Sequence, residues 1–176
     1  AGEVGEMNTR ALTSAALAGA LQPMIGSVNM VSAPVVARER GIKVDEVRQS
    51  RRGAYGTYIR FTVRTDELER SVAGTVFSDG KPRIIQIKGI DLEAEFGAHM
   101  LYVTNHDKPG FIGAIGSLLG NAGVNIATFS LGRDAGSTPS QMVALIETDT
   151  SVTEPILQKL LSNPVVRKAR IVEVGG

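Results

Sequence analysis

The chain has 176 residues, 43% of them hydrophobic and 21% charged, so it is long enough to fold as one medium or two small globular domains. Its net charge of +1 argues against nucleic acid as a partner, and no apolar run approaches the roughly 20 residues that a membrane helix needs. Because it has no cysteine, only two histidines and no N-terminal signal pattern, we expect a cytoplasmic protein without disulfides, a bound metal or a membrane partner.

The first part of the chain predicts two helices. Asn8 or Thr9 can cap the first helix, and the apolar side chains expected on its buried face are Leu12, Ala15, Ala16 and Leu21. Residues 29–34 predict a connector with strand character, and residues 35–40 predict a short helix that Gly41 ends.

A mostly antiparallel sheet is predicted next. The expected strands are residues 44–48, 58–64, 70–77 and 83–88. Apolar and polar residues alternate cleanly at 58–64, which is typical of a strand with one wet face. Asp79 and Gly80 predict a hairpin turn, whereas residues 89–97 predict a connector.

The remainder of the chain predicts the order βαββαβ. An apolar strand at residues 100–104 leads to Pro109, whose fixed φ suits the start of a helix, and Gly123 is suited to the left-handed position after that helix. The later elements expected are strands at residues 124–131, 141–148 and 165–174, a loop at 132–140 and a helix at 152–162.

Two polar loops flank the first helix of this βαββαβ segment, one with Asp107 and the other with Asn125, and we expect both to face a ligand at the helix N-terminus. A carboxylate there can bind the ammonium of a free amino acid, while helix N–H groups bind its carboxylate. The alternative is that Asp107 complements the helix dipole and that Asn125 only forms a turn.

The Asp-Lys-Pro-Gly sequence at residues 107–110, the apolar helix after it and the Gly-Val-Asn-Ile sequence at 123–126 together resemble the ACT domain, a small regulatory module that binds amino acids. Residues 29–42 resemble the intervening domain of long-form D-3-phosphoglycerate dehydrogenase. The resemblance implies an α+β fold. An intervening α/β domain with a mostly antiparallel sheet would occupy residues 1–97, and a ferredoxin-like βαββαβ ACT domain would occupy residues 98–176.

The resemblance also implies that L-serine binds as a feedback effector at an interface between ACT domains. The residues of that site would be Asn105, Asp107, Pro109, Gly110, Asn125 and Ile126. Members of the family often carry histidine or tyrosine where this chain has Asn105. The implied partners are L-serine or a similar amino acid, a second copy of the chain in a homodimer or tetramer, and the catalytic domains of the parent chain.

Basic residues are frequent in the predicted sheet of the first domain and suggest a site for a phosphorylated anion. The candidates are Arg51, Arg52 and Arg83. The alternative is a solvated face of the sheet. The resemblance implies an anionic ligand for this domain, with Arg83 at a basic position and Glu95 where a second basic residue would be expected.

We predict no catalytic residue in this chain. It lacks a glycine-rich dinucleotide fingerprint, so NAD, the cofactor that the resemblance implies for the parent enzyme, is expected to bind elsewhere in that enzyme. One alternative is the regulatory part of an L-serine dehydratase or of another amino-acid-sensing ACT protein. Another is a hydrolase that uses Asp45, Glu46 and the arginines, although such carboxylates usually form surface ion pairs.

Overall fold

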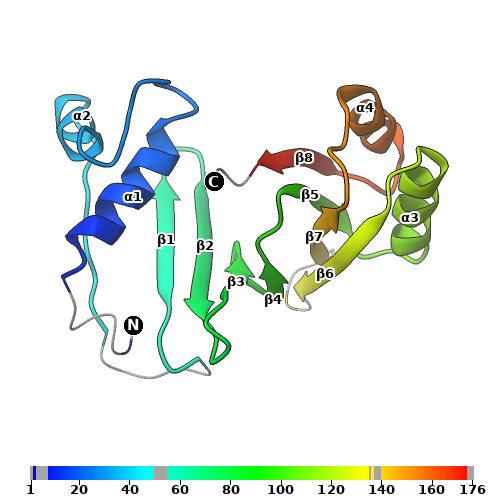
Figure 1. Cartoon of the computed structure of the whole chain (residues 1–176), viewed down its shortest axis with the longest axis horizontal. Coiled ribbons are helices and arrows are strands. Elements are labelled where there is room, and N and C mark those ends of the chain that lie inside the picture. The colour runs from blue at the N-terminus through cyan, green and yellow to red at the C-terminus, as the bar shows by residue number, and fades with distance from the viewer. Residues whose placement is uncertain (1, 3–7, 50–54, 135, 137–139, 174–176) are drawn as a thin grey trace. The chain divides into compact units, whose positions relative to one another are not determined.

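Four helices and two four-stranded antiparallel sheets make up the described part of the chain in a computed structural model (Figure 1). The structure describes residues 2, 8–49, 55–134, 136 and 140–173. The chain divides into two compact units, residues 1–61 and 62–176, which are described separately. The predicted α+β class is confirmed.

The first unit contains two short helices, α1 (Arg10–Leu21) and α2 (Ala33–Glu39). They pack through a small core of buried side chains, namely Leu17, Leu21, Val28, Ala33 and Ala37. The predicted face of α1 is partly wrong, because Leu12 is 39% exposed and Leu17 is buried instead.

The segments around α2 differ from the prediction. The Asn29 side chain accepts hydrogen bonds from the backbone N–H groups of Val31 and Ser32, so residues 29–32 form turns and the helix begins at Ala33. The strand predicted at residues 44–48 is also wrong, since residues 42–49 lie in no helix or strand. Within this segment Glu46 accepts a hydrogen bond of 2.6 Å from the Thr9 hydroxyl at the start of α1.

The first sheet has the strand order β1-β2-β3-β4. Its strands are β1 (Ile59–Arg64), β2 (Glu69–Val76), β3 (Pro82–Ile87) and β4 (Ile90–Glu95). The Asp79–Gly80 turn is confirmed, with Gly80 at a φ of 78° and the Lys81 N–H donating to Asp79 Oδ1 at 2.9 Å. The predicted connector at residues 89–97 is wrong, because most of it forms β4, whose burial alternates from Ile90 through Ala94.

The second sheet has the order β6-β7-β5-β8, and two helices lie on one of its sides (Figure 1). Its elements are β5 (His99–His106), α3 (Phe111–Asn121), β6 (Ile126–Asp134), β7 (Gln141–Thr148), α4 (Glu154–Ser162) and β8 (Lys168–Glu173). This confirms the βαββαβ order. Phe111, Ile115 and Leu119 of α3 are buried against the sheet, and Gly123 has the expected positive φ of 73°.

The side of this sheet without helices is covered by β4. Leu92 and Ala94 of β4 pack with Met100 of β5 and Leu145 of β7. Strand β7 therefore has buried residues on both faces, as its continuous apolar run predicts.

Candidate functional site

The site predicted around Asp107 is built by the turn between β5 and α3. The Asp107 N–H donates to the Ser140 carbonyl at 2.9 Å, which holds the turn against the start of β7. Gly110 caps α3 with a φ of 92°, a conformation that favours glycine, and the buried Phe111 anchors the first helical turn. The first N–H groups of α3 have no acceptor inside the helix, so they are available to a ligand.

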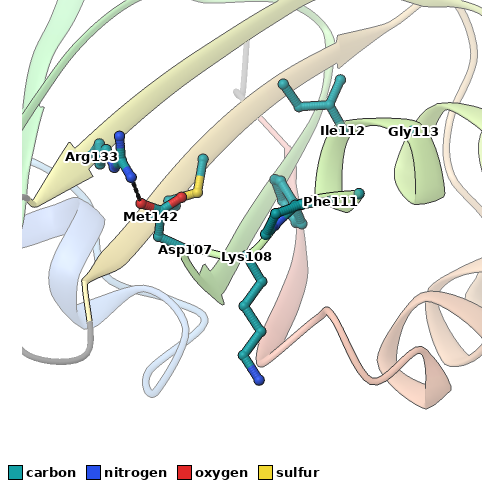
Figure 2. A pocket seen from close by; sticks show the side chains of 9 residues that line it. Asp107, Lys108, Phe111, Ile112, Gly113, Arg133 and Met142 are labelled. Atoms are coloured by element: carbon teal, nitrogen blue, oxygen red, sulfur yellow. Dashed lines mark ion pairs between the residues drawn. The ribbon is translucent and has the colours of Figure 1, made fainter.

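A pocket of about 370 Å³ lies at this turn, a volume at the small end of the usual range for small-molecule sites. It is lined by the segment from Asp107 to Gly113 and by Arg133 and Met142 from the neighbouring strands (Figure 2). The pocket therefore contains the predicted residues Asp107, Pro109 and Gly110.

Asp107 forms an ion pair with Arg133 of β6, in which Arg133 Nη2 contacts Asp107 Oδ2. The Asp107 side chain is only 16% exposed, whereas that of Arg133 is 64% exposed. A largely buried carboxylate needs such a cationic partner, because its desolvation is otherwise unfavourable. The structure thus shows Asp107 already holding a positively charged group.

Asn105 was predicted to contact the ligand directly, but in the structure it is buried and does not line the pocket. Its side chain is 1% exposed, and its amide donates to the Met142 sulfur at 3.8 Å. Met142 pairs with both Asn105 and Arg133 across the sheet, so these three side chains lie in one row on the same face. Met142, and not Asn105, lines the pocket.

Asn125 and Ile126 lie at the far end of α3 from Asp107. Asn125 donates to Asp149 Oδ2 at 2.7 Å, and Asp149 follows the last residue of β7, whereas Asp107 is beside the first. The length of β7 thus separates them, about 25 Å for eight residues. The expectation that Asp107 and Asn125 face one ligand within one chain is wrong.

Arg133 was missed because residues 132–140 were assigned to a loop, and Met142 was missed because it was interpreted only as part of the buried strand predicted at residues 141–148. Strand β6 continues to Asp134, so that assignment is wrong for its first three residues. A signal was present: Phe129 and Leu131 pack against the helices, and Arg133 follows them with the same two-residue period. Continuing that alternation would have placed Arg133 on the face that carries α3.

Of the predicted anion-binding residues, Arg51 and Arg52 lie outside the described residues. Arg83 Nη2 contacts Asp79 at 2.6 Å and Glu95 at 2.7 Å, and its guanidinium lies 4.4 Å from the centroid of the Phe77 ring. An anion at Arg83 would compete with two carboxylates. Arg83 is only 15% exposed and lies in a network of ion pairs, which is not the solvated sheet face given as the alternative, and the anion site stays a prediction.

No helix among the described residues is both long and apolar enough to cross a membrane. In the same part of the chain, no group of three or more potential metal-ligating histidine, aspartate or glutamate side chains is found.

The second sheet and its two helices have the ferredoxin-like βαββαβ fold and carry the pocket, and another four-stranded antiparallel sheet precedes them in the chain. Comparison with known families gives two matches: the D-3-phosphoglycerate dehydrogenase intervening domain over residues 1–88 and the ACT domain over residues 99–165. The chain belongs to the family of D-3-phosphoglycerate dehydrogenase intervening domains and carries an ACT domain after that segment.

Similar curated proteins agree with this assignment. The chain is 29% identical over 174 residues to D-3-phosphoglycerate dehydrogenase of Bacillus subtilis, and the match covers 98% of this chain and 33% of that protein. It is 30% identical over 168 residues to the protein of the same name from Synechocystis, with 95% and 30% coverage. The chain spans about a third of the length of the curated relatives it matches and corresponds to their C-terminal regulatory part.

Proposed function

We propose that this chain senses an amino acid as the regulatory part of a D-3-phosphoglycerate dehydrogenase and that L-serine is its feedback effector. The family matches and the similarity across 98% of the chain support the dehydrogenase over a serine dehydratase. In this proposal the whole enzyme oxidises 3-phosphoglycerate with NAD in domains outside this sequence. This chain binds the effector and carries no catalytic residue.

The observation that carries the proposal is the Asp107 carboxylate beside the N-terminus of α3. It is largely buried, faces a pocket of small-molecule size and already binds a cation, so it can bind the ammonium of an amino acid. The free N–H groups of the first turn of α3 add a partner for an anionic group of the same ligand.

The predicted contacts with Asn125 and Ile126 require a second chain in this proposal. Both residues lie at the opposite end of α3 from Asp107, so one protomer would supply Asp107, Pro109 and Gly110 and its partner would supply Asn125 and Ile126. Asn105 would support the site indirectly, through its hydrogen bond to Met142. The ACT domain would occupy residues 98–176 and the intervening domain residues 1–97.

Calorimetric titration of the 176-residue chain with L-serine, D-serine, glycine, L-alanine and L-threonine tests the proposal. We expect saturable binding that is strongest for L-serine. Asp107→Asn should lose on the order of 2–5 kcal/mol of binding free energy, because the ligand ammonium then faces no charged partner.

Asp91→Asn is a matched control for Asp107→Asn. It removes the same charge from β4, where the Asp91 carboxylate accepts a hydrogen bond from Gln86 at 2.7 Å outside the pocket. This control should bind L-serine as tightly as the parent chain. Absence of saturable binding for every amino acid, or unchanged affinity in Asp107→Asn, would reject the proposal.

A further inference from the structure

Arg133 lines the pocket and is paired with the carboxylate that the ammonium of a ligand would have to bind. Its guanidinium is paired with Asp107, the carboxylate to which the proposed function assigns the ligand ammonium (Figure 2). Because the guanidinium contacts Asp107 Oδ2 and offsets the charge of the carboxylate, an incoming ammonium binds Asp107 more weakly than it would bind an unpaired carboxylate. Any amine that enters the pocket therefore competes with Arg133.

The backbone of Arg133 is held in the sheet, whereas its side chain is largely exposed. Arg133 lies in the β6–β7 ladder opposite Met142, which sets the position of its Cα beside the pocket. Its side chain is 64% exposed, so the guanidinium can rotate within the pocket at little cost in burial. Lys108 also lines the pocket, but its side chain extends away from Asp107 (Figure 2).

An amino acid can displace the Arg133 guanidinium from Asp107 and still provide it with a new ion-pair partner. Its ammonium takes the place of Arg133 on Asp107, and its carboxylate, attached to the same carbon atom, offers Arg133 a new anionic partner. Planar guanidinium binds carboxylate with two parallel hydrogen bonds. An amine without a carboxylate displaces Arg133 from Asp107 and offers the guanidinium no new anionic partner.

We infer that Arg133 is the carboxylate-binding residue of the amino-acid site and that its pairing with Asp107 excludes simple amines from the ligand-free pocket. This inference rests on the proposed function and names the ligand class, a zwitterionic α-amino acid with a small side chain. The opposed charges of Asp107 and Arg133 form a dipole that matches the zwitterion. The N–H groups of the first turn of α3 add to the binding of this carboxylate.

The test compares L-serine with ethanolamine, which keeps the ammonium and hydroxyl groups but lacks the carboxylate. Both ligands are titrated into the parent chain and into Arg133→Gln, Arg133→Lys and Lys108→Gln. Lys108→Gln is the matched control because it removes one positive charge from the same pocket without touching Asp107.

We expect the parent chain to prefer L-serine strongly over ethanolamine. Arg133→Gln should weaken L-serine binding about tenfold to a hundredfold, the usual effect of one lost hydrogen-bonded ion pair. The same change should strengthen ethanolamine binding, because Asp107 no longer has a competing partner. Arg133→Lys should give an intermediate preference, and Lys108→Gln should retain the preference of the parent chain.

Each other outcome has a separate meaning. If the parent chain binds L-serine and Arg133→Gln binds it equally well, the inference is overturned and the proposed function stands. If Arg133→Gln weakens both ligands to the same extent, Arg133 is only structural and the inference is again overturned. If the parent chain binds neither ligand, the proposed function fails and the inference falls with it.

Discussion

At the scale of single residues, the ion pairs of Arg83 with Asp79 and Glu95 affect how stability depends on pH. The hydrogen bonds from Arg83 lower the pKa of Asp79 from 3.8 to about 2, and a hydrogen bond from the Lys81 N–H adds to this effect. Arg83 likewise lowers the pKa of Glu95, with Lys81 as the second partner.

The first prediction follows from the lowered pKa of Asp79. A folded-state pKa below the ordinary value stabilises the folded chain above pH 3.8, and that contribution is lost as the pH falls toward about 2. Urea unfolding at pH 5 and near pH 2.5 should therefore show a loss of stability on acidification that Asp79→Asn reduces. Asp66→Asn, at an exposed carboxylate without an ion pair among the described residues, is the control and should keep the loss.

In the candidate site, the position of Asp107 could be predicted from the sequence around it, whereas its pairing with Arg133 could not. Asp107 was identifiable because it stands between an apolar strand and a helix start, where a carboxylate has local reasons to lie. Arg133 is separated from Asp107 by a helix and a strand, so their pairing depends on the register of β6 with β7. Asn105 was wrongly predicted to contact the ligand, because its contact with Met142 joins residues far apart in the sequence and leaves no local sequence pattern.

At the scale of elements, the tight turn between β3 and β4 contains an unusual residue. Lys88 has a φ of 54° and Gly89 a φ of 81°, and two positive φ values are typical of a type I′ hairpin turn. Burial lowers the pKa of Lys88, and the charges of Arg70 and Arg167 lower it further. Asparagine tolerates this conformation better than lysine and carries no charge.

The second prediction is that Lys88→Asn stabilises the chain by about 0.5–1 kcal/mol. Since burial lowers the pKa of Lys88 in the folded state, desolvation of its charge opposes folding at neutral pH, a cost that the Tyr102 ring, 5.4 Å from Nζ, offsets in part and that disappears only above the ordinary pKa of 10.5. Lys88→Met is the companion variant, because it removes the charge and keeps the backbone strain. Thermal unfolding should rank Lys88→Asn above Lys88→Met, and equal midpoints would show that the turn is not strained.

Strand β4 leaves no room for a side chain at Gly132 of β6. A Cβ atom on Gly132 would lie 2.5 Å from the Asp91 carbonyl oxygen and 2.8 Å from Ile90 Cγ2, and both atoms belong to β4. At Gly97 a Cβ atom would instead meet the end of the Glu147 side chain, which can move.

The third prediction is that Gly132→Ala destabilises the chain by about 1–3 kcal/mol, since the main chain of β4 has to shift to accept the methyl group. Gly97→Ala is the matched change and should have a smaller effect. Urea denaturation of both variants measures the difference. Equal stability of the two would show that β4 does not pack closely on β6.

Most elements with strong local patterns were predicted from the sequence, but β4 was missed although its pattern was present. Apolar and acidic residues alternate from Ile90 to Glu95, as in a strand with one buried face, yet this segment was interpreted as a connector between domains. Residues 44–48 show the opposite error: they have a strand-like composition but form no strand in the described part of the chain, because composition alone does not set the pairing of a strand.

At the scale of the whole molecule, the separation of Asp107 from Asn125 decides how many chains a shared site needs. The second sheet ends at β6 and β8, and such edges expose unpaired backbone groups that favour pairing with another chain. If two copies associate through a two-fold interface, each site can combine Asp107 of one protomer with Asn125 of the other. Binding to the dimer alone would then make L-serine shift the chain toward the dimer, by a free energy that grows as RT ln(1 + [L]/Kd).

The fourth prediction is complementation between two inactive variants. Asp107→Asn and Asn125→Ala should each bind L-serine poorly when studied alone. Mixed and allowed to exchange, they form heterodimers in which one site has both substitutions and the other has neither. Calorimetry should then recover up to one intact site per heterodimer, and sedimentation should show L-serine favouring dimers in the mixture. If the site lay within one chain, mixing would restore no binding, because every chain would still carry one defect.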